Sequence, residues 1–162
     1  MNSSFSFYED GSRVLTPDAF QFVLESELKR AVRSQTFLTL VVVEAKREWD
    51  EVSVTADDGT VRELAEMVSH EVRDTDMISQ TGTGRLSLAL LDADLESSRT
   101  VIDRLVGRFD SYDFGAPLSI AVGAACYPTH AVDADSLRRE ALSHPVVSRR
   151  LASEHRSSED VK

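Results

Sequence analysis

The 162-residue sequence has a single cysteine, Cys126, and no long apolar run. One thiol excludes an internal disulfide framework and a zinc site built from several cysteines. The longest apolar run, residues 38–43, is interrupted only by Thr39 and has the length of a strand, whereas a membrane-spanning helix needs roughly 20 residues. The N-terminus lacks the basic and apolar regions of a secretory signal. We therefore expect a cytoplasmic protein with no membrane segment.

The sequence also has fewer basic than acidic residues. It contains 18 Lys and Arg and 28 Asp and Glu, which gives a net charge of −10. This charge repels a phosphate backbone, so we expect no nucleic acid among the partners. The four histidines lie far apart in the sequence, without a second ligand at the spacing of a metal site. The composition, 41% hydrophobic and 28% charged, is that of a globular protein.

The spacing of apolar residues predicts alternating helices and strands. The first helix begins with Thr16 as its N-cap and Pro17 in its first turn. From Glu44 to Gly59 the apolar pattern fails, and we expect a loop. The elements predicted after the first helix are a strand at 37–43, a helix at 61–73, a hairpin of strands at 77–78 and 86–91, a helix at 95–109, a strand at 118–126 and a helix at 133–142.

This order contains the βαββαβ unit of ferredoxin-like folds, so the predicted fold class is α+β, with a mainly antiparallel sheet flanked by helices. Right-handed crossovers place the strands at 37–43 and 118–126 next to each other or near the centre of the sheet, with the hairpin beside them. We divide the chain into an N-terminal arm (1–13), one domain (14–150) and a disordered tail (151–162).

Three groups of polar residues are candidates for a site. Glu44 ends the most apolar strand and Asp58 follows in the expected loop, so the two could hold Mg²⁺; alternatively, they only end a strand and start a helix. Arg73 and Asp76 either pair with each other or bind a phosphate and a guanine edge. Residues 82–84, Gly-Thr-Gly, either cradle a phosphate or form a tight turn, and the turn is the simpler interpretation because a strand follows.

The segment from residue 65 to 86 resembles the GGDEF domain of diguanylate cyclases. A helix, the motif Arg73-x-x-Asp76, a strand and the turn Gly82-Thr83-Gly84-Arg85-Leu86 follow one another at that family's spacing. Residues 118–128 are similar to its next strand, Ser-Ile-Gly-Val-Ala-x-Tyr-Pro, and Leu15-Thr16 resembles its opening motif. The resemblance covers about residues 14–142. It implies a nucleotide-cyclase-like sheet and a part in bacterial-type cyclic di-GMP signalling.

The departures from the family pattern imply that catalysis is lost. In the turn, Thr83 adds a side chain where a glycine lets GTP approach, Gly84 lacks the metal-binding acid, and Arg85 puts a cation where an acid stood. The family's metal-binding Asp-x-Asp becomes Glu44-Ala45-Lys46, and Pro145 ends the helix that would lead to its phosphate contacts. Phosphoryl transfer with two metals needs carboxylates that neutralise developing charge. We therefore expect no cyclase activity, no catalytic residue and no cofactor, with Glu44 and Asp58 as the remaining metal candidates.

Two functions without catalysis stay open. Arg73 and Asp76 match the family's inhibitory product site, which would make the chain a receptor for cyclic di-GMP. Alternatively, the fold serves as an interaction module that docks a protein partner in trans; a homodimer is compatible with either function. We place docking first, because Gln80 stands where many family members have a further ligand-binding Arg. An enzyme acting on another nucleotide ranks last, with only Glu44 and Asp58 in its favour.

Overall fold

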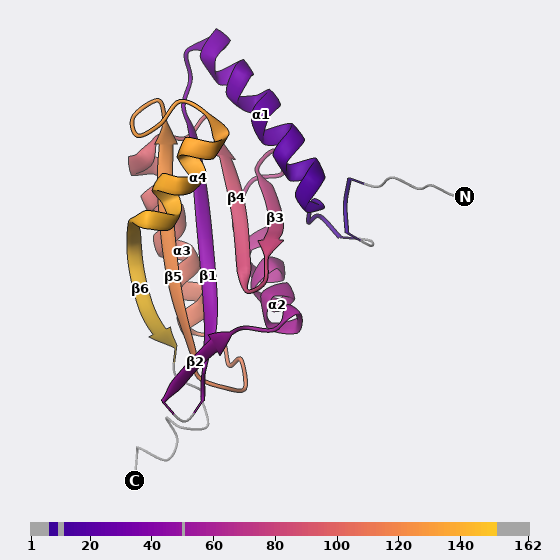
Figure 1. Cartoon of the computed structure of the whole chain (residues 1–162), viewed down its shortest axis with the longest axis vertical. Helices are drawn as coiled ribbons and strands as arrows, with labels where there is room; N and C mark the ends of the chain where they lie inside the picture. The colour runs from indigo at the N-terminus through magenta and orange to yellow at the C-terminus, as the bar shows by residue number, and fades with distance from the viewer. Residues whose placement is uncertain (1–6, 10–11, 50, 152–162) are drawn as a thin grey trace, which may run out of the picture.

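The computed structural model describes residues 7–9, 12–49 and 51–151. Figure 1 shows one sheet with α1 and α4 on one face and α2 and α3 on the other. The strand order is β3-β4-β1-β5-β6, and β2 pairs with the far end of β1. The elements in chain order are α1 (Pro17–Ser34), β1 (Leu38–Trp49), β2 (Val52–Thr55), α2 (Asp58–Ser69), β3 (Met77–Gly82), β4 (Arg85–Leu91), α3 (Leu95–Asp110), β5 (Leu118–Tyr127), α4 (Ala134–Ser143) and β6 (Pro145–Leu151).

The predicted βαββαβ unit is confirmed as β1-α2-β3-β4-α3-β5, and with it the α+β class. All strand pairs are antiparallel, and β1 lies between β4 and β5, as the crossover rule predicted. The central position of β1 follows from its composition. Its alternate residues enter two apolar clusters, so that Val41 and Val43 pack with α2 and α3 whereas Leu40 and Val42 pack with α1 and α4.

Four side chains of Asp or Thr start the helices. Thr16, Asp57, Asp94 and Asp133 each accept a hydrogen bond from the backbone N–H three residues on, the usual N-cap contact. The interpretation of Asp57-Asp58-Gly59 as a helix start is therefore confirmed. The helix α2 ends at Ser69 and not near Arg73, because His70 is its C-cap.

The predicted loop from Glu44 to Gly59 is wrong. β1 continues to Trp49 and turns back as β2, with Lys46 opposite Thr55 and Trp49 opposite Val52. Glu44, Lys46 and Glu48 lie on the sheet face that no helix covers here (Figure 1). Arg47 and Trp49 on the other face are not buried either, so the end of β1 lacks the apolar pattern of its first half. From Pro145 on, where no element was predicted, the chain forms the strand β6. Proline suits the first residue of an edge strand, since it donates no ladder hydrogen bond.

Gly123 sets the close approach of α4 to β5. A Cβ added there would lie 1.8 Å from the carbonyl oxygen of Ala141 in α4, so only glycine fits. This contact holds α4 over the upper part of β5 (Figure 1). The lower part of the same sheet face stays open.

At both ends of the domain predicted as residues 14–150, the described chain continues into the fold. In the N-terminal arm, Tyr8 forms a bridge with Leu15, and Leu15 forms a parallel bridge with Ser79 of β3. Leu151, assigned to the tail by the sequence, instead ends β6 and is buried. The rest of the predicted disordered tail lies outside the described residues. Among those that are described, no helix has the length and apolar character to cross a membrane.

Candidate functional site

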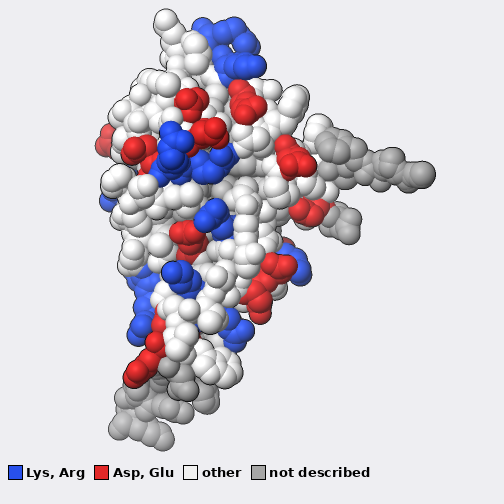
Figure 2. All heavy atoms as spheres, viewed as in Figure 1, with Lys and Arg blue, Asp and Glu red and all other residues white. Residues whose placement is uncertain are grey.

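The open half of the sheet face, below α4, carries the polar residues of β1. Glu44, Lys46 and Glu48 lie at every second position of β1, on the side on which α1 and α4 lie. A hollow of about 440 Å³ lies over them, and Figure 2 shows both signs of charge side by side on this face. The hollow is also lined by Ser53 of β2, Ser119, Ile120 and Ala121 of β5, and Ser148, Arg149 and Arg150 of β6.

Glu44 is paired with Arg85 of the neighbouring strand. The two residues are directly opposite in the β1–β4 register. The Arg85 guanidinium donates from Nη2 at 2.9 Å and from Nε at 3.2 Å to the same oxygen, Oε2 of Glu44. The side chains of Glu44 and Arg85 are 40% and 35% exposed, and Glu44 lines the hollow. The one carboxylate where the family's first strand carries metal ligands is thus neutralised by a cation.

The turn between β3 and β4 is closed by the end of β2. Gly84 has a φ of 67°, in the left-handed region that favours glycine, and is buried. Its carbonyl accepts from the N–H of Ala45 at 2.9 Å, and the carbonyl of Ala45 accepts from the N–H of Ala56 at 3.0 Å. A Cβ added at Gly84 would lie 2.4 Å from Cγ2 of Thr55. The tight-turn interpretation is confirmed, and β2 fills the space beside it.

Glu48 is the best-satisfied carboxylate of the hollow. It accepts from the hydroxyls of Ser119 at 2.6 Å and Ser53 at 3.0 Å, and from Arg150 at 3.4 Å. The hydrogen bonds from Ser119 and Ser53, with smaller contributions from Arg150 and Lys46, hold the pKa of the Glu48 carboxyl below its ordinary value. Sequence reasoning missed Glu48 because it placed this residue in a loop. The charges at 44, 46 and 48 share one side of a strand, but the further charge at Arg47 hides that pattern.

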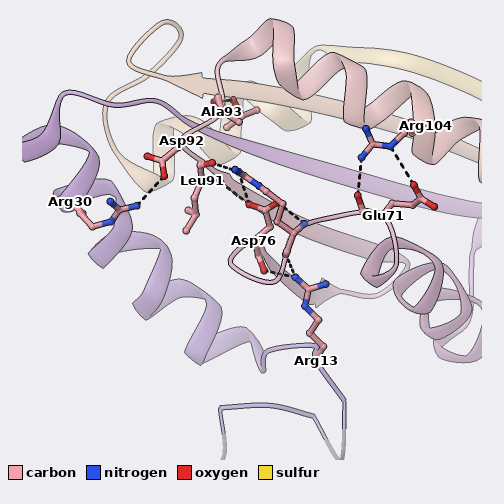
Figure 3. A network of polar contacts seen from close by, with 10 residues as sticks. Arg13, Arg30, Glu71, Asp76, Leu91, Asp92, Ala93 and Arg104 are labelled. Atoms are coloured by element: carbon pink, nitrogen blue, oxygen red, sulfur yellow. Dashed lines mark hydrogen bonds and ion pairs between the residues drawn. The ribbon is translucent and has the colours of Figure 1, made fainter.

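Arg73 and Asp76 form a closed pair. The Asp76 side chain is buried, with 5% exposed, and accepts from the backbone N–H, Nε and Nη2 of Arg73 at 3.1–3.3 Å and from the N–H of Leu91 at 3.0 Å. Arg73 also donates to the carbonyl of Leu91, and Arg13 donates to the carbonyls of Ser69, Arg73 and Asp76. Figure 3 shows Asp76 between Arg13 and the end of β4 at Leu91. The pairing proposed from the sequence is therefore present, and the Arg73 side chain remains 58% exposed.

The second metal candidate from the sequence, Asp58, lies in a separate contact. Its Oδ1 accepts from Nε2 of Gln80 at 2.9 Å, at the start of α2. The neighbouring Asp57 caps the helix, and the N–H of Thr60 holds the pKa of the Asp57 carboxyl below its ordinary value. The structure therefore brings Glu44 to Arg85 and Asp58 to Gln80, rather than joining the two carboxylates.

These residues do not fit the pair of metal ions that diguanylate cyclases use. Glu44 is in an ion pair with Arg85, Lys46 lines the same hollow, and Gly84 has neither a carboxylate nor space for one. Divalent magnesium needs oxygen ligands and is repelled by neighbouring cations. Among the residues that the structure describes, no group of three or more His, Cys, Asp or Glu side chains is arranged to hold a metal ion.

Comparison with known proteins identifies the fold. No family model matches the sequence, and no curated protein is similar to it. Among solved structures, a DGC protein from Thermotoga maritima superposes with a TM-score of 0.69 at 17% identity, over 83% of this chain and 97% of that one. The GGDEF domain of DgcB from Caulobacter crescentus, in complex with c-di-GMP, gives a TM-score of 0.68 at 12% identity, over 86% of each chain.

A third similar structure is the diguanylate cyclase SiaD from Pseudomonas aeruginosa in complex with its activator SiaC. It gives a TM-score of 0.67 at 16% identity, over 85% of this chain and 57% of that one. The fold of this chain is therefore that of GGDEF domains, as the resemblance implied.

Proposed function

We propose that this chain is a catalytically silent GGDEF-like module that acts in cyclic di-GMP signalling by docking a partner protein. The observation that carries the proposal is the ion pair between Glu44 and Arg85. Arg85 thereby engages the only carboxylate at the position where the family's first strand binds metal. The complex of the similar protein SiaD with its activator SiaC supports a docking role, since a GGDEF protein there binds another protein.

The charges at Glu44 oppose the binding of a divalent cation. A metal ion at this carboxylate would have to displace Arg85 and would then lie near its guanidinium. Two unit charges of the same sign 4 Å apart repel each other by about 4 kcal/mol at an effective dielectric constant of 20, and a divalent ion doubles this. A triphosphate with its metal ion therefore finds no second carboxylate as a metal ligand, and the one carboxylate that is present lies beside a cation.

The space beside the turn is a second obstacle to catalysis. The family's third signature position carries an acid, whereas Gly84 has a positive φ and a side chain there would overlap Thr55. A simple replacement of Gly84 by an acid therefore conflicts with β2.

Thermal unfolding of the full chain tests the silent state. A ligand that binds only the folded state raises the melting temperature by mass action. We expect millimolar GTP or GDP with Mg²⁺ to leave the melting temperature unchanged. A rise with GTP and Mg²⁺ that is absent with Mg²⁺ alone would contradict the proposal and would indicate a nucleotide site.

A receptor for cyclic di-GMP is the second candidate, favoured by the exposed guanidinium of Arg73 beside Asp76. Calorimetry with cyclic di-GMP separates the two functions. Arg104→Ala is the matched control, because Arg104 is similarly exposed and pairs with Glu71. Binding that Arg73→Ala abolishes and Arg104→Ala retains would establish the receptor. No heat from the parent protein would leave docking as the function.

A further inference from the structure

The outer face of α1 carries two large apolar side chains in solvent. Phe22 is 62% exposed and Val32 is 52% exposed. Glu25 and Lys29, also exposed, lie between them. With 3.6 residues per turn, these four positions share one side of the helix, which we call the α1 face.

The α1 face is complementary to itself. Phe22 and Val32 lie five residues on either side of position 27, and Glu25 and Lys29 lie two residues on either side of it. If two copies of α1 meet antiparallel about a two-fold axis near this position, each Phe22 meets Val32 of the second copy. Each Glu25 then meets Lys29 of the second copy, so both contacts occur twice.

A groove at the end of this face can receive the phenylalanine. It lies between α1 and the start of α4, has a volume of about 480 Å³ and has an apolar wall made by Leu28, Val32 and Val132. Its polar rim carries both signs of charge, with Lys29 and Arg139 beside the carboxylates of Glu25, Asp133 and Asp135. In the antiparallel arrangement, Phe22 of the second copy arrives over Val32, directly beside this wall. A large aromatic side chain in an apolar pocket is the usual anchor of an interface.

We propose that the α1 face and the α1–α4 groove bind a second copy of this chain. Charge complementarity favours a second copy as the partner. In an antiparallel pair, the order Phe, Glu, Lys, Val places each acid against a base and each apolar side chain against another. The other exposed apolar cluster, formed by Trp49 (67% exposed), Val52 and Val54 on β1 and β2, has no such match of charges. The net charge of −10 opposes the approach of two copies at low salt, and at physiological ionic strength it is screened beyond about 8 Å.

Sedimentation equilibrium of the full chain near physiological salt tests the proposal. We expect the mass to rise with concentration from 17.9 kDa toward twice that value. Phe22→Ser should give a monomer at every concentration, whereas Trp49→Ser should associate like the parent. Both positions are exposed, so both variants fold, and circular dichroism checks this.

Charge reversal gives the sharper test. Glu25→Lys alone, or Lys29→Glu alone, places like charges together at both symmetric contacts and should weaken association by about tenfold, which corresponds to about 1.4 kcal/mol. The double variant Glu25→Lys/Lys29→Glu restores opposite charges and should associate like the parent. A monomeric parent, a dimer indifferent to Phe22→Ser, or a double variant as weak as the single ones would overturn the proposal. None of these results depends on nucleotide binding, so the proposed function is tested separately.

Discussion

Replacement of Gly84 by alanine tests whether β2 has closed the space beside the turn. The change adds a Cβ to a residue with a φ of 67°, which costs roughly 1–2 kcal/mol in an L-amino acid. The added atom would lie 2.4 Å from Cγ2 of Thr55 and 3.0 Å from the carbonyl oxygen of Ala45. Such overpacking costs typically about 1–3 kcal/mol. We therefore expect Gly84→Ala to lower the free energy of unfolding by about 2–5 kcal/mol.

Urea unfolding of the purified chain measures this loss, and a control separates its two causes. Gly115 has a φ of 80°, and a Cβ there would meet nothing within 4 Å. Gly115→Ala should therefore show the backbone cost alone, about 1–2 kcal/mol. A domain of this size loses roughly 2–4 °C of melting temperature for each kcal/mol, so the two variants should differ measurably by heat as well.

A double-mutant cycle with Thr55→Ser isolates the contact, because serine removes Cγ2 and keeps the hydroxyl. We expect the second substitution to recover about 1 kcal/mol or more of the loss caused by Gly84→Ala. If Gly84→Ala costs no more than Gly115→Ala, or if Thr55→Ser recovers nothing, then β2 does not close this space and the steric part of the reasoning is wrong.

Three further predictions concern other parts of the fold. Asp76→Ala should lower the free energy of unfolding by about 3–5 kcal/mol, because it leaves buried N–H donors unpaired, and Arg73→Ala should cost less; urea unfolding compares them. Gly123→Ala should cost more than about 3 kcal/mol, since its Cβ would overlap the carbonyl of Ala141, and hydrogen exchange should rise in α4. The N–H of Ser97 lowers the pKa of the Asp94 carboxyl, so its capping contribution is present above about pH 4 and is lost as the pH falls through the lowered pKa. Asp94→Ser keeps a cap that does not titrate, so the parent's advantage over this variant should disappear in acid; an unchanged difference would refute the assignment.

The sequence was sufficient for the parts of the fold in which local signals agree. The order of the apolar patterns predicted the βαββαβ unit, and the capping residue Thr16 predicted where α1 begins. These signals depend on neighbouring residues, and the structure confirms them. The pairing of Arg73 with Asp76, three residues apart, was accessible for the same reason.

The candidate site depended on contacts between distant residues and could be predicted only in part. The sequence showed that Arg85 replaces an acid, but the bond to Glu44 follows from a register that joins positions 41 residues apart. The end of β1 was interpreted as a loop because the charged residues at 44 and 46–48 give no apolar alternation. Such a sequence fits a strand only where the sheet is left uncovered. The contact of Thr55 with the turn, and that of Ser119 with Glu48, could not be derived without that strand.

We infer that the turn and Glu44 cannot support diguanylate cyclase chemistry. The most direct measurement is incubation of the purified chain with GTP and either Mg²⁺ or Mn²⁺, followed by chromatography for cyclic di-GMP. We predict no product above a metal-free control, because Arg85 holds Glu44 and Gly84 supplies no acid. Accumulation of cyclic di-GMP in the presence of metal would contradict this inference and would mean that Glu44 leaves its ion pair with Arg85 to bind a metal ion.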